Sequence, residues 1–167
     1  LKISGESLAG LNEQGFDFDI LNDLSNSIKK LQSKKLKISI VLGGGNFIRG
    51  SSFSNGVVDR VTSDYMGMLG TVINSLALQS NLKKIGVESR VMTAISINRV
   101  AEPYIKNKAS NHLEKNRVVI FASGTGNPFF STDTAAVLRA SEMKSDVILK
   151  GTKAVSYTHL RAHETLS

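Results

Sequence analysis

Residues 37–45 have the sequence KISIVLGGG, a short apolar run that ends in three glycines. A run of this length without strict polar alternation is typical of a strand buried on both faces of a parallel sheet. Glycines directly after such a strand permit a positive φ and let backbone N–H groups approach an anion closely. The stretch therefore predicts a strand in an α/β fold and a candidate anion-binding loop at its end.

Four further apolar runs have the same character: Leu1–Ser4, Ser89–Ala94, Arg117–Ala122 and Asp146–Lys150. Helical patterns separate these runs, over the segment after Asp17, Asp64–Ile85, Ala101–Glu114 and Thr132–Met143. Asp17 and Thr132 are candidate N-caps, Asp133 falls in a first turn, and Gly86 is a C-terminal signal. Alternating strands and helices predict a three-layer αβα sandwich with a mainly parallel sheet.

The composition favours small anionic partners. The 167 residues carry 21 Lys and Arg against 14 Asp and Glu, a formal net charge of +7. Aromatic residues are only 6% and Trp is absent, which argues against a nucleic-acid surface. The uncharged run Tyr65–Leu82 contains Asn, Gln and Ser, so it favours a buried or interface helix over a membrane span. The absence of Cys excludes thiolate metal sites and suits a reducing cytoplasm.

Glycines follow three of the predicted strands, as Gly5, Gly43–Gly45, and Gly124 with Gly126. Since the carboxyl ends of parallel strands share one edge, these loops predict a phosphate site there. Lys2, Arg49 and Lys150 lie close to the same ends, and phosphoryl transfer needs such cations to neutralise transition-state charge. No Walker motif, metal-ligand set or Ser-His-Asp arrangement is apparent, and we interpret His112 as a surface residue.

The stretch Gly124–Asp133, GTGNPFFSTD, combines hydrogen-bond donors, two aromatic side chains and a predicted helix start. One interpretation is an ordinary loop with an N-cap and two core phenylalanines. The other is a pocket for a planar, hydrogen-bonding ligand and its phosphate. The residue types alone leave both interpretations open.

Five motifs resemble, in order, those of bacterial-type uridylate (UMP) kinases within the amino-acid-kinase superfamily. They are KISGE (Lys2–Glu6), GGGNFIRG (Gly43–Gly50), DYMGML (Asp64–Leu69), GTGNPFFSTD (Gly124–Asp133) and DVILKGTK (Asp146–Lys153). The glycine triad resembles other members of the superfamily too, whereas the GTGNPFF loop is much more specific to UMP kinases.

This resemblance implies transfer of a phosphoryl group from ATP to UMP with Mg²⁺, giving ADP and UDP in pyrimidine nucleotide synthesis. It implies catalytic roles for Lys2, Arg49 and Asp146, with Asp146 orienting the catalytic lysine. It implies ATP contacts for Lys2, Ile3, Ser4, Gly5, Gly45, Arg49 and Thr152. It implies UMP contacts for Gly44, Asp64, Thr125, Gly126, Asn127, Pro128, Phe129, Phe130, Ser131 and Thr132.

The resemblance further implies a cytoplasmic homohexamer with GTP and UTP as effectors, GTP acting near Gly10–Gly15, and no nucleic-acid or membrane partner. It ends at about Lys153. We therefore divide the chain into a kinase domain, residues 1–153, and a non-family tail, residues 154–167, which we interpret as artefactual or disordered. Because most of the family's ATP lobe does not follow, we expect little or no kinase activity from this chain.

Three alternatives remain open at this point. A superfamily kinase for a carboxylate or carbamate acceptor would lack UMP-dependent ADP release. A non-catalytic nucleotide-binding module would bind UMP without turnover. A basic nucleic-acid binder would show steeply salt-dependent binding without nucleotide specificity.

Overall fold

The computed structural model describes residues 1–12, 14–48 and 57–152. Its elements in chain order are β1 (Lys2–Ile3), α1 (Gly5–Ala9), η1 (Gly10–Asn12), α2 (Phe18–Ser33), β2 (Ser39–Leu42), α3 (Arg60–Lys84), β3 (Ser89–Thr93), β4 (Glu102–Pro103), α4 (Lys106–Glu114), β5 (Val118–Ala122), α5 (Thr132–Glu142) and β6 (Lys150–Gly151).

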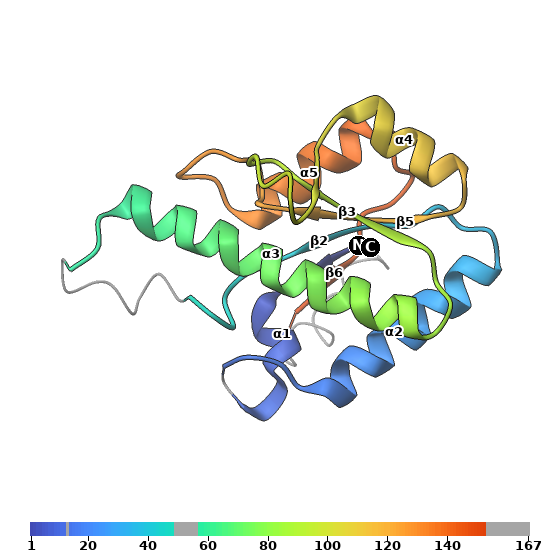
Figure 1. The fold of residues 1–167 in the computed structure, drawn as a ribbon, viewed down its shortest axis with the longest axis horizontal. Helices are drawn as coiled ribbons and strands as arrows, with labels where there is room; N and C mark the ends of the chain where they lie inside the picture. Colours follow the sequence, from blue (N-terminus) through green and yellow to red (C-terminus); the bar gives the residue numbers. More distant parts are fainter. Residues whose placement is uncertain (13, 49–56, 153–167) are drawn as a thin grey trace, which may run out of the picture.

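The six strands form one sheet in the order β4-β3-β5-β2-β1-β6, and every pairing is parallel. Helices α4 and α5 cover one face, and α1, α2 and α3 cover the other (Figure 1). The predicted three-layer αβα sandwich is confirmed. Since all strands run the same way, the carboxyl ends of β1, β2, β5 and β6 lie at one edge of the sheet.

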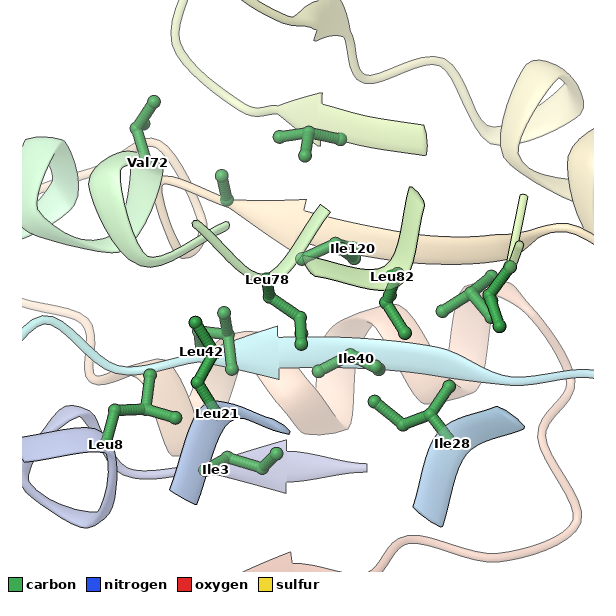
Figure 2. Close-up of a cluster of buried hydrophobic side chains, with 14 residues drawn as sticks. Ile3, Leu8, Leu21, Ile28, Ile40, Leu42, Val72, Leu78, Leu82 and Ile120 are labelled. Carbon is green, nitrogen blue, oxygen red and sulfur yellow. The ribbon is translucent and has the colours of Figure 1, made fainter. Parts of the chain in front are cut away.

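The apolar side chains of the central strands alternate between two cores. On β2, Ile40 and Leu42 face α2 and α3, whereas Val41 faces the opposite core beneath α4 and α5. On β5, Ile120 faces the core beneath α2 and α3, and Phe121 faces the core beneath α4 and α5. Figure 2 shows the first of these cores, in which side chains of β1, β2 and β5 meet those of the helices. Burial on both faces explains why these strands lack polar residues at every second position.

Two predicted boundaries are wrong because each involves a strand of only two residues. The predicted strand Asp146–Lys150 is displaced, since only Lys150–Gly151 pairs with β1. The predicted helix Ala101–Glu114 begins only at Lys106, because Glu102–Pro103 pairs with β3 as the edge strand β4. Strands of two residues carry no periodic signal that a sequence pattern could detect.

Two helix starts also differ from prediction. α3 begins at Arg60, where the Asp59 carboxylate accepts a hydrogen bond from the Thr62 N–H at 3.1 Å. Asp64 therefore lies one turn inside the helix. α5 is capped by Ser131, whose hydroxyl accepts from the Thr134 N–H at 3.1 Å, so Thr132 is the first helical residue and not the N-cap. The other cap predictions, Asp17 and Gly86, are confirmed.

The uncharged middle of α3 is buried on one side only. Leu78 and Leu82 are fully buried against the sheet, whereas Tyr65, Leu69 and Ile73 are exposed. Within the described residues, no helix combines the length and the hydrophobicity needed to cross a bilayer.

Candidate functional site

A cleft of about 160 Å³ opens at the edge of the sheet where the strand C-termini meet. Three parts of the chain line it: the glycine loop after β2, one face of α3, and the loop between β5 and α5. Its lining residues are Gly44, Gly45, Ile48, Ser63, Asp64, Gly67, Met68, Thr71, Gly124, Thr125, Phe130 and Thr132. The structure thus brings together Gly44, Gly45, Asp64, Thr125, Phe130 and Thr132, which the sequence analysis took from separate motifs.

Glycine is required in the β2 loop because the loop backbone touches α3. A Cβ on Gly44 would lie 2.5 Å from the Gly67 carbonyl oxygen, which no side chain tolerates. A Cβ on Gly5 would lie 2.6 Å from both the Gly45 nitrogen and Asn46 Oδ1. Gly5, Gly43, Gly44 and Gly45 all have a negative φ, so the triad does not use the positive φ that glycine permits. Gly43 and Gly44 are required instead by the close approach of their backbones to Gly5 and Gly67.

The loop after β5 does depend on positive φ. Ser123 has φ +64°, Gly124 +56° and Gly126 +83°, so the chain turns sharply out of the strand. The Ser123 N–H donates to Thr71 Oγ1 of α3 at 2.7 Å, and its hydroxyl pairs with Thr93 Oγ1 of β3 at 2.8 Å. These contacts fix where the loop begins, directly opposite the glycine loop of β2.

Asp64 connects α3 to the tip of this loop. Its Oδ2 accepts a hydrogen bond from the Phe129 N–H at 2.7 Å. Its carboxylate also accepts from Arg60 Nε, one turn earlier, at 2.9 and 3.0 Å. The Arg60 guanidinium lies 5.7 Å from the Phe129 ring centroid, within cation–π range. Asp64 is thus an acceptor at the cleft wall that already holds a backbone donor from the facing loop.

The remaining residues of that loop have mixed roles. Asn127 donates its N–H to Thr125 Oγ1 at 3.2 Å, which folds the loop back on itself. Phe129 and Phe130 are exposed, so the interpretation of two core phenylalanines is wrong. Ser131 serves as the N-cap of α5, and Pro128 is half-buried.

A charged cluster lies at the ends of β1 and β6. The Nζ of Lys2, nearly buried, is 2.9 Å from Asp133 Oδ1, and the Nζ of Lys150 is 2.7 Å from Asp133 Oδ2. Hydrogen bonds from Lys150 and then Lys2 hold the pKa of the Asp133 carboxyl below its ordinary value. Asp133 therefore stays ionised and holds two ammonium groups at the same edge of the sheet as the Gly43–Gly45 loop.

This cluster differs from the predicted one. The carboxylate that contacts both lysines is Asp133, whereas the predicted lysine-orienting residue was Asp146. Asp146 is exposed, and among the described residues it has no ion pair or hydrogen bond. From the sequence, Asp133 is predicted only as a residue in the first turn of a helix. Arg49 lies outside the described residues, whereas Thr152 directly follows β6.

Of the residues around β1 that were predicted to contact ATP, most have side chains that serve the fold. Ile3 points into the hydrophobic core, and its carbonyl accepts the Gly43 N–H at 2.8 Å. Ser4 caps α1 and shares a 2.6 Å hydrogen bond with the Ser7 hydroxyl. Gly5 opens α1 against the Gly43–Gly45 loop. Lys2 is the one described residue of this group whose charged side chain reaches the cluster.

The interpretation of His112 as a surface residue is wrong. Its side chain is only 14% exposed and lies between Glu102 and Arg117, 3.1 Å from one and 3.3 Å from the other. Because a guanidinium can only donate, His112 Nδ1 accepts from Arg117 and Nε2 carries the proton toward Glu102. This group is structural and stands apart from the cleft lining.

Residues 1–155 match the Amino acid kinase family. The chain belongs to this family. It is similar to the solved UMP kinase from Bacillus anthracis, with 43% identity and a TM-score of 0.88 over 92% of this chain and 64% of that chain. It is also similar to the UMP kinase from Ureaplasma parvum, with 42% identity and a TM-score of 0.87 over 92% of this chain and 68% of that one. The chain thus spans about two thirds of these relatives, and its resemblance to UMP kinases is confirmed.

Two glycine substitutions in this member of the amino acid kinase family have opposite expected effects. Gly44→Ala places a methyl group against the Gly67 carbonyl, so we expect a loss of about 1–3 kcal/mol in the free energy of unfolding. Gly67→Ala meets nothing within 4 Å and replaces glycine in a helix, so we expect a gain of about 0.5–1 kcal/mol. Urea denaturation of both variants measures this, and equal effects would contradict the close approach of the loop to α3.

The ion cluster predicts a pH dependence of stability. A carboxyl whose folded pKa is lowered stabilises the protein above its unfolded pKa, about 3.9, and loses that contribution as pH falls through the folded pKa. We therefore expect Asp133→Asn to be less stable than the wild type near pH 7, with the difference shrinking as the solution becomes more acidic than about pH 4. Urea denaturation at several pH values measures this.

Asp146→Asn is the matched control, because Asp146 has no ionic partner in the described chain. We expect this variant to follow the wild type at every pH. A stability difference for Asp133→Asn that stays constant with pH would refute the assigned ion pairs.

Proposed function

We propose that this chain is part of a UMP kinase, which transfers a phosphoryl group from ATP to UMP. It carries the half of the enzyme that binds the acceptor, UMP, and the Gly43–Gly45 loop that binds phosphate, which we call the phosphate cradle. The observation that carries this proposal is the cleft in which Gly44, Asp64 and the Thr125–Thr132 loop face each other. The identity of 43% to a UMP kinase supports the choice of acceptor.

The cleft fits a nucleoside monophosphate in two ways. The Asp64 carboxylate is a strong acceptor for a ribose hydroxyl, and at present it accepts the Phe129 N–H. A ribose bound there therefore competes with the loop tip for Asp64. The N–H groups of Gly44 and Gly45 have no acceptor among the described residues, and both glycines line the cleft. Such donors suit the phosphate of the acceptor.

The reaction needs positioning and charge neutralisation more than proton transfer. An oxygen of the UMP phosphate attacks the γ-phosphorus of ATP, the bond to the β–γ bridging oxygen breaks, and ADP leaves. The second pKa of a phosphate monoester is near 6, so the acceptor is mainly a dianion at neutral pH and needs no general base. The absence of a catalytic histidine from the cleft is consistent with this chemistry.

We assign charge neutralisation to Lys2 and Lys150, with Asp133 as the residue that orients them. The two lysines and one carboxylate leave an excess of one positive charge beside the cradle. Asp133 replaces Asp146 in this proposal because its carboxylate contacts both ammonium groups. The predicted contribution of Arg49 stays a prediction.

Mg²⁺ fits this site as part of the ATP complex. The described residues contain no cluster of three or more potential metal ligands, and Mg²⁺ in kinases is commonly bound through substrate phosphates and one or two carboxylates. Bound there, the ion would neutralise phosphate charge during transfer.

The family resemblance also supports proposals about assembly and regulation. A homohexamer built on dimers needs apolar contact surfaces, and the exposed Tyr65, Leu69 and Ile73 on α3 offer one. GTP and UTP as effectors, and a cytoplasmic location, remain proposals from the same resemblance.

Calorimetry of UMP binding to the 167-residue chain tests the acceptor assignment. We expect UMP to bind and CMP to bind much more weakly, and saturation with UMP at 100 times its Kd to add about 2.7 kcal/mol to stability. Asp64→Asn should weaken UMP binding by about 1–3 kcal/mol, because a hydrogen bond to a charged group is lost.

Asp59→Asn is the matched control for this measurement. Asp59 lies near Asp64 on the same helix but caps it, and Asn caps as well as Asp does. It should therefore bind UMP like the wild type. UMP affinity that is unchanged in Asp64→Asn would remove Asp64 from the site, and no UMP binding by the wild type would overturn the proposed acceptor.

A further inference from the structure

Two asparagine side chains are buried behind the glycine loop and bind each other. Asn46 is 1% exposed and Asn74, on α3, is 0% exposed. Asn46 Nδ2 donates to Asn74 Oδ1 at 2.9 Å, and Asn74 Nδ2 donates to Asn46 Oδ1 at 2.7 Å. The two amides form a closed pair. Burial of two polar amides without partners would be costly, so this pair depends on its hydrogen bonds.

The second hydrogen of each amide reaches a backbone carbonyl. Asn74 Nδ2 donates to the Gly43 carbonyl at 2.7 Å, and Asn46 Nδ2 donates to the Gly15 carbonyl at 2.7 Å. Because carbonyls only accept, these contacts fix the orientation of both amides. The Gly15 N–H also donates to the Asn46 carbonyl at 3.1 Å. Asn46 thus binds both the N–H and the carbonyl of Gly15, in the segment before α2.

The pair therefore fastens both ends of the glycine loop to α3. Gly43 is held through its carbonyl and Asn46 through its side chain, while Gly44 and Gly45 lie between these two anchors. Consecutive glycines have more backbone freedom than any other sequence, so an unanchored triad would lose its geometry. Anchoring keeps the N–H groups of Gly44 and Gly45 in place before a ligand arrives, which lowers the entropic cost of binding.

We propose that Asn46 and Asn74 are positioning residues for the phosphate cradle. They contact no ligand themselves, and act through the backbone of Gly43–Gly45. The inference rests on the proposed function for its affinity test, because UMP is the probe. It has a second test, amide exchange at Gly43, that needs no ligand.

Asn81 supplies a matched control on the same helix. It lies seven residues after Asn74, about 10 Å along the axis, and is also buried. Its Nδ2 donates to the Leu21 carbonyl, Asn22 Oδ1 and Ser25 Oγ, which tie α3 to α2 and not to the glycine loop. Asn74→Asp and Asn81→Asp therefore both place a carboxylate where amide donors were, but only the first loosens the cradle.

The experiment compares wild type, Asn74→Asp and Asn81→Asp by UMP calorimetry and by hydrogen exchange of the Gly43 N–H, which donates to the Ile3 carbonyl. We expect both variants to be less stable. We expect only Asn74→Asp to raise the Kd for UMP, about tenfold, and to speed Gly43 exchange more than Asn81→Asp does. Asn74→Ser, which removes the amide without adding charge, replaces Asn74→Asp if the latter does not fold.

Equal UMP affinity and equal Gly43 exchange in the Asn74 and Asn81 variants would overturn the inference. If the wild type binds no UMP, the proposed function fails, but the exchange comparison still decides the role of the asparagine pair.

Discussion

The site depends on the close packing of the loop after β2 against one face of α3. Successive turns of the helix present Asp64, Gly67, Thr71 and Asn74 on that face, at intervals of three or four residues. The Gly67 carbonyl leaves no room for a side chain on Gly44. The Thr71 hydroxyl accepts a hydrogen bond from the Ser123 N–H, and the Asn74 amide donates one to the Gly43 carbonyl. This one face of α3 thereby positions both loops of the cleft. It also supplies Asp64, the hydrogen-bond acceptor that lies between them.

The parallel sheet makes this arrangement possible, because it brings the ends of β1, β2, β5 and β6 to one edge. The glycine loop and the β5 loop meet α3 on one side of that edge. Lys2 and Lys150, from the neighbouring strands β1 and β6, meet Asp133 at the start of α5. The cleft and the adjacent pair of cations thus arise from strand direction together with two loop contacts.

The sequence predicts those features that depend on local patterns. The apolar runs of β2, β3 and β5 are local, as is Gly86, whose φ of +77° ends α3. The motifs also predict which residues gather in the cleft, since Gly44, Asp64 and Thr125 lie there together. The features that local patterns do not predict are contacts between residues far apart in the sequence.

The position of Asp133 shows why. Its partners are Lys2, more than a hundred residues earlier, and Lys150. The two lysines become neighbours only because β6 pairs with β1. Without that pairing, the only carboxylate offered for the lysines was Asp146, which the family resemblance implied. The asparagine pair was equally hidden, because Asn46 and Asn74 become partners only when the loop packs on α3.

The most direct test of this account is a ¹H–¹⁵N spectrum of the chain titrated with UMP. The account predicts that the amide shifts concentrate at Gly44, Gly45 and the Thr125–Thr132 loop, with the Phe129 N–H among the largest because it leaves Asp64. Shifts that concentrate elsewhere on the chain, with the amides of Gly44 and Phe129 unmoved, would contradict it.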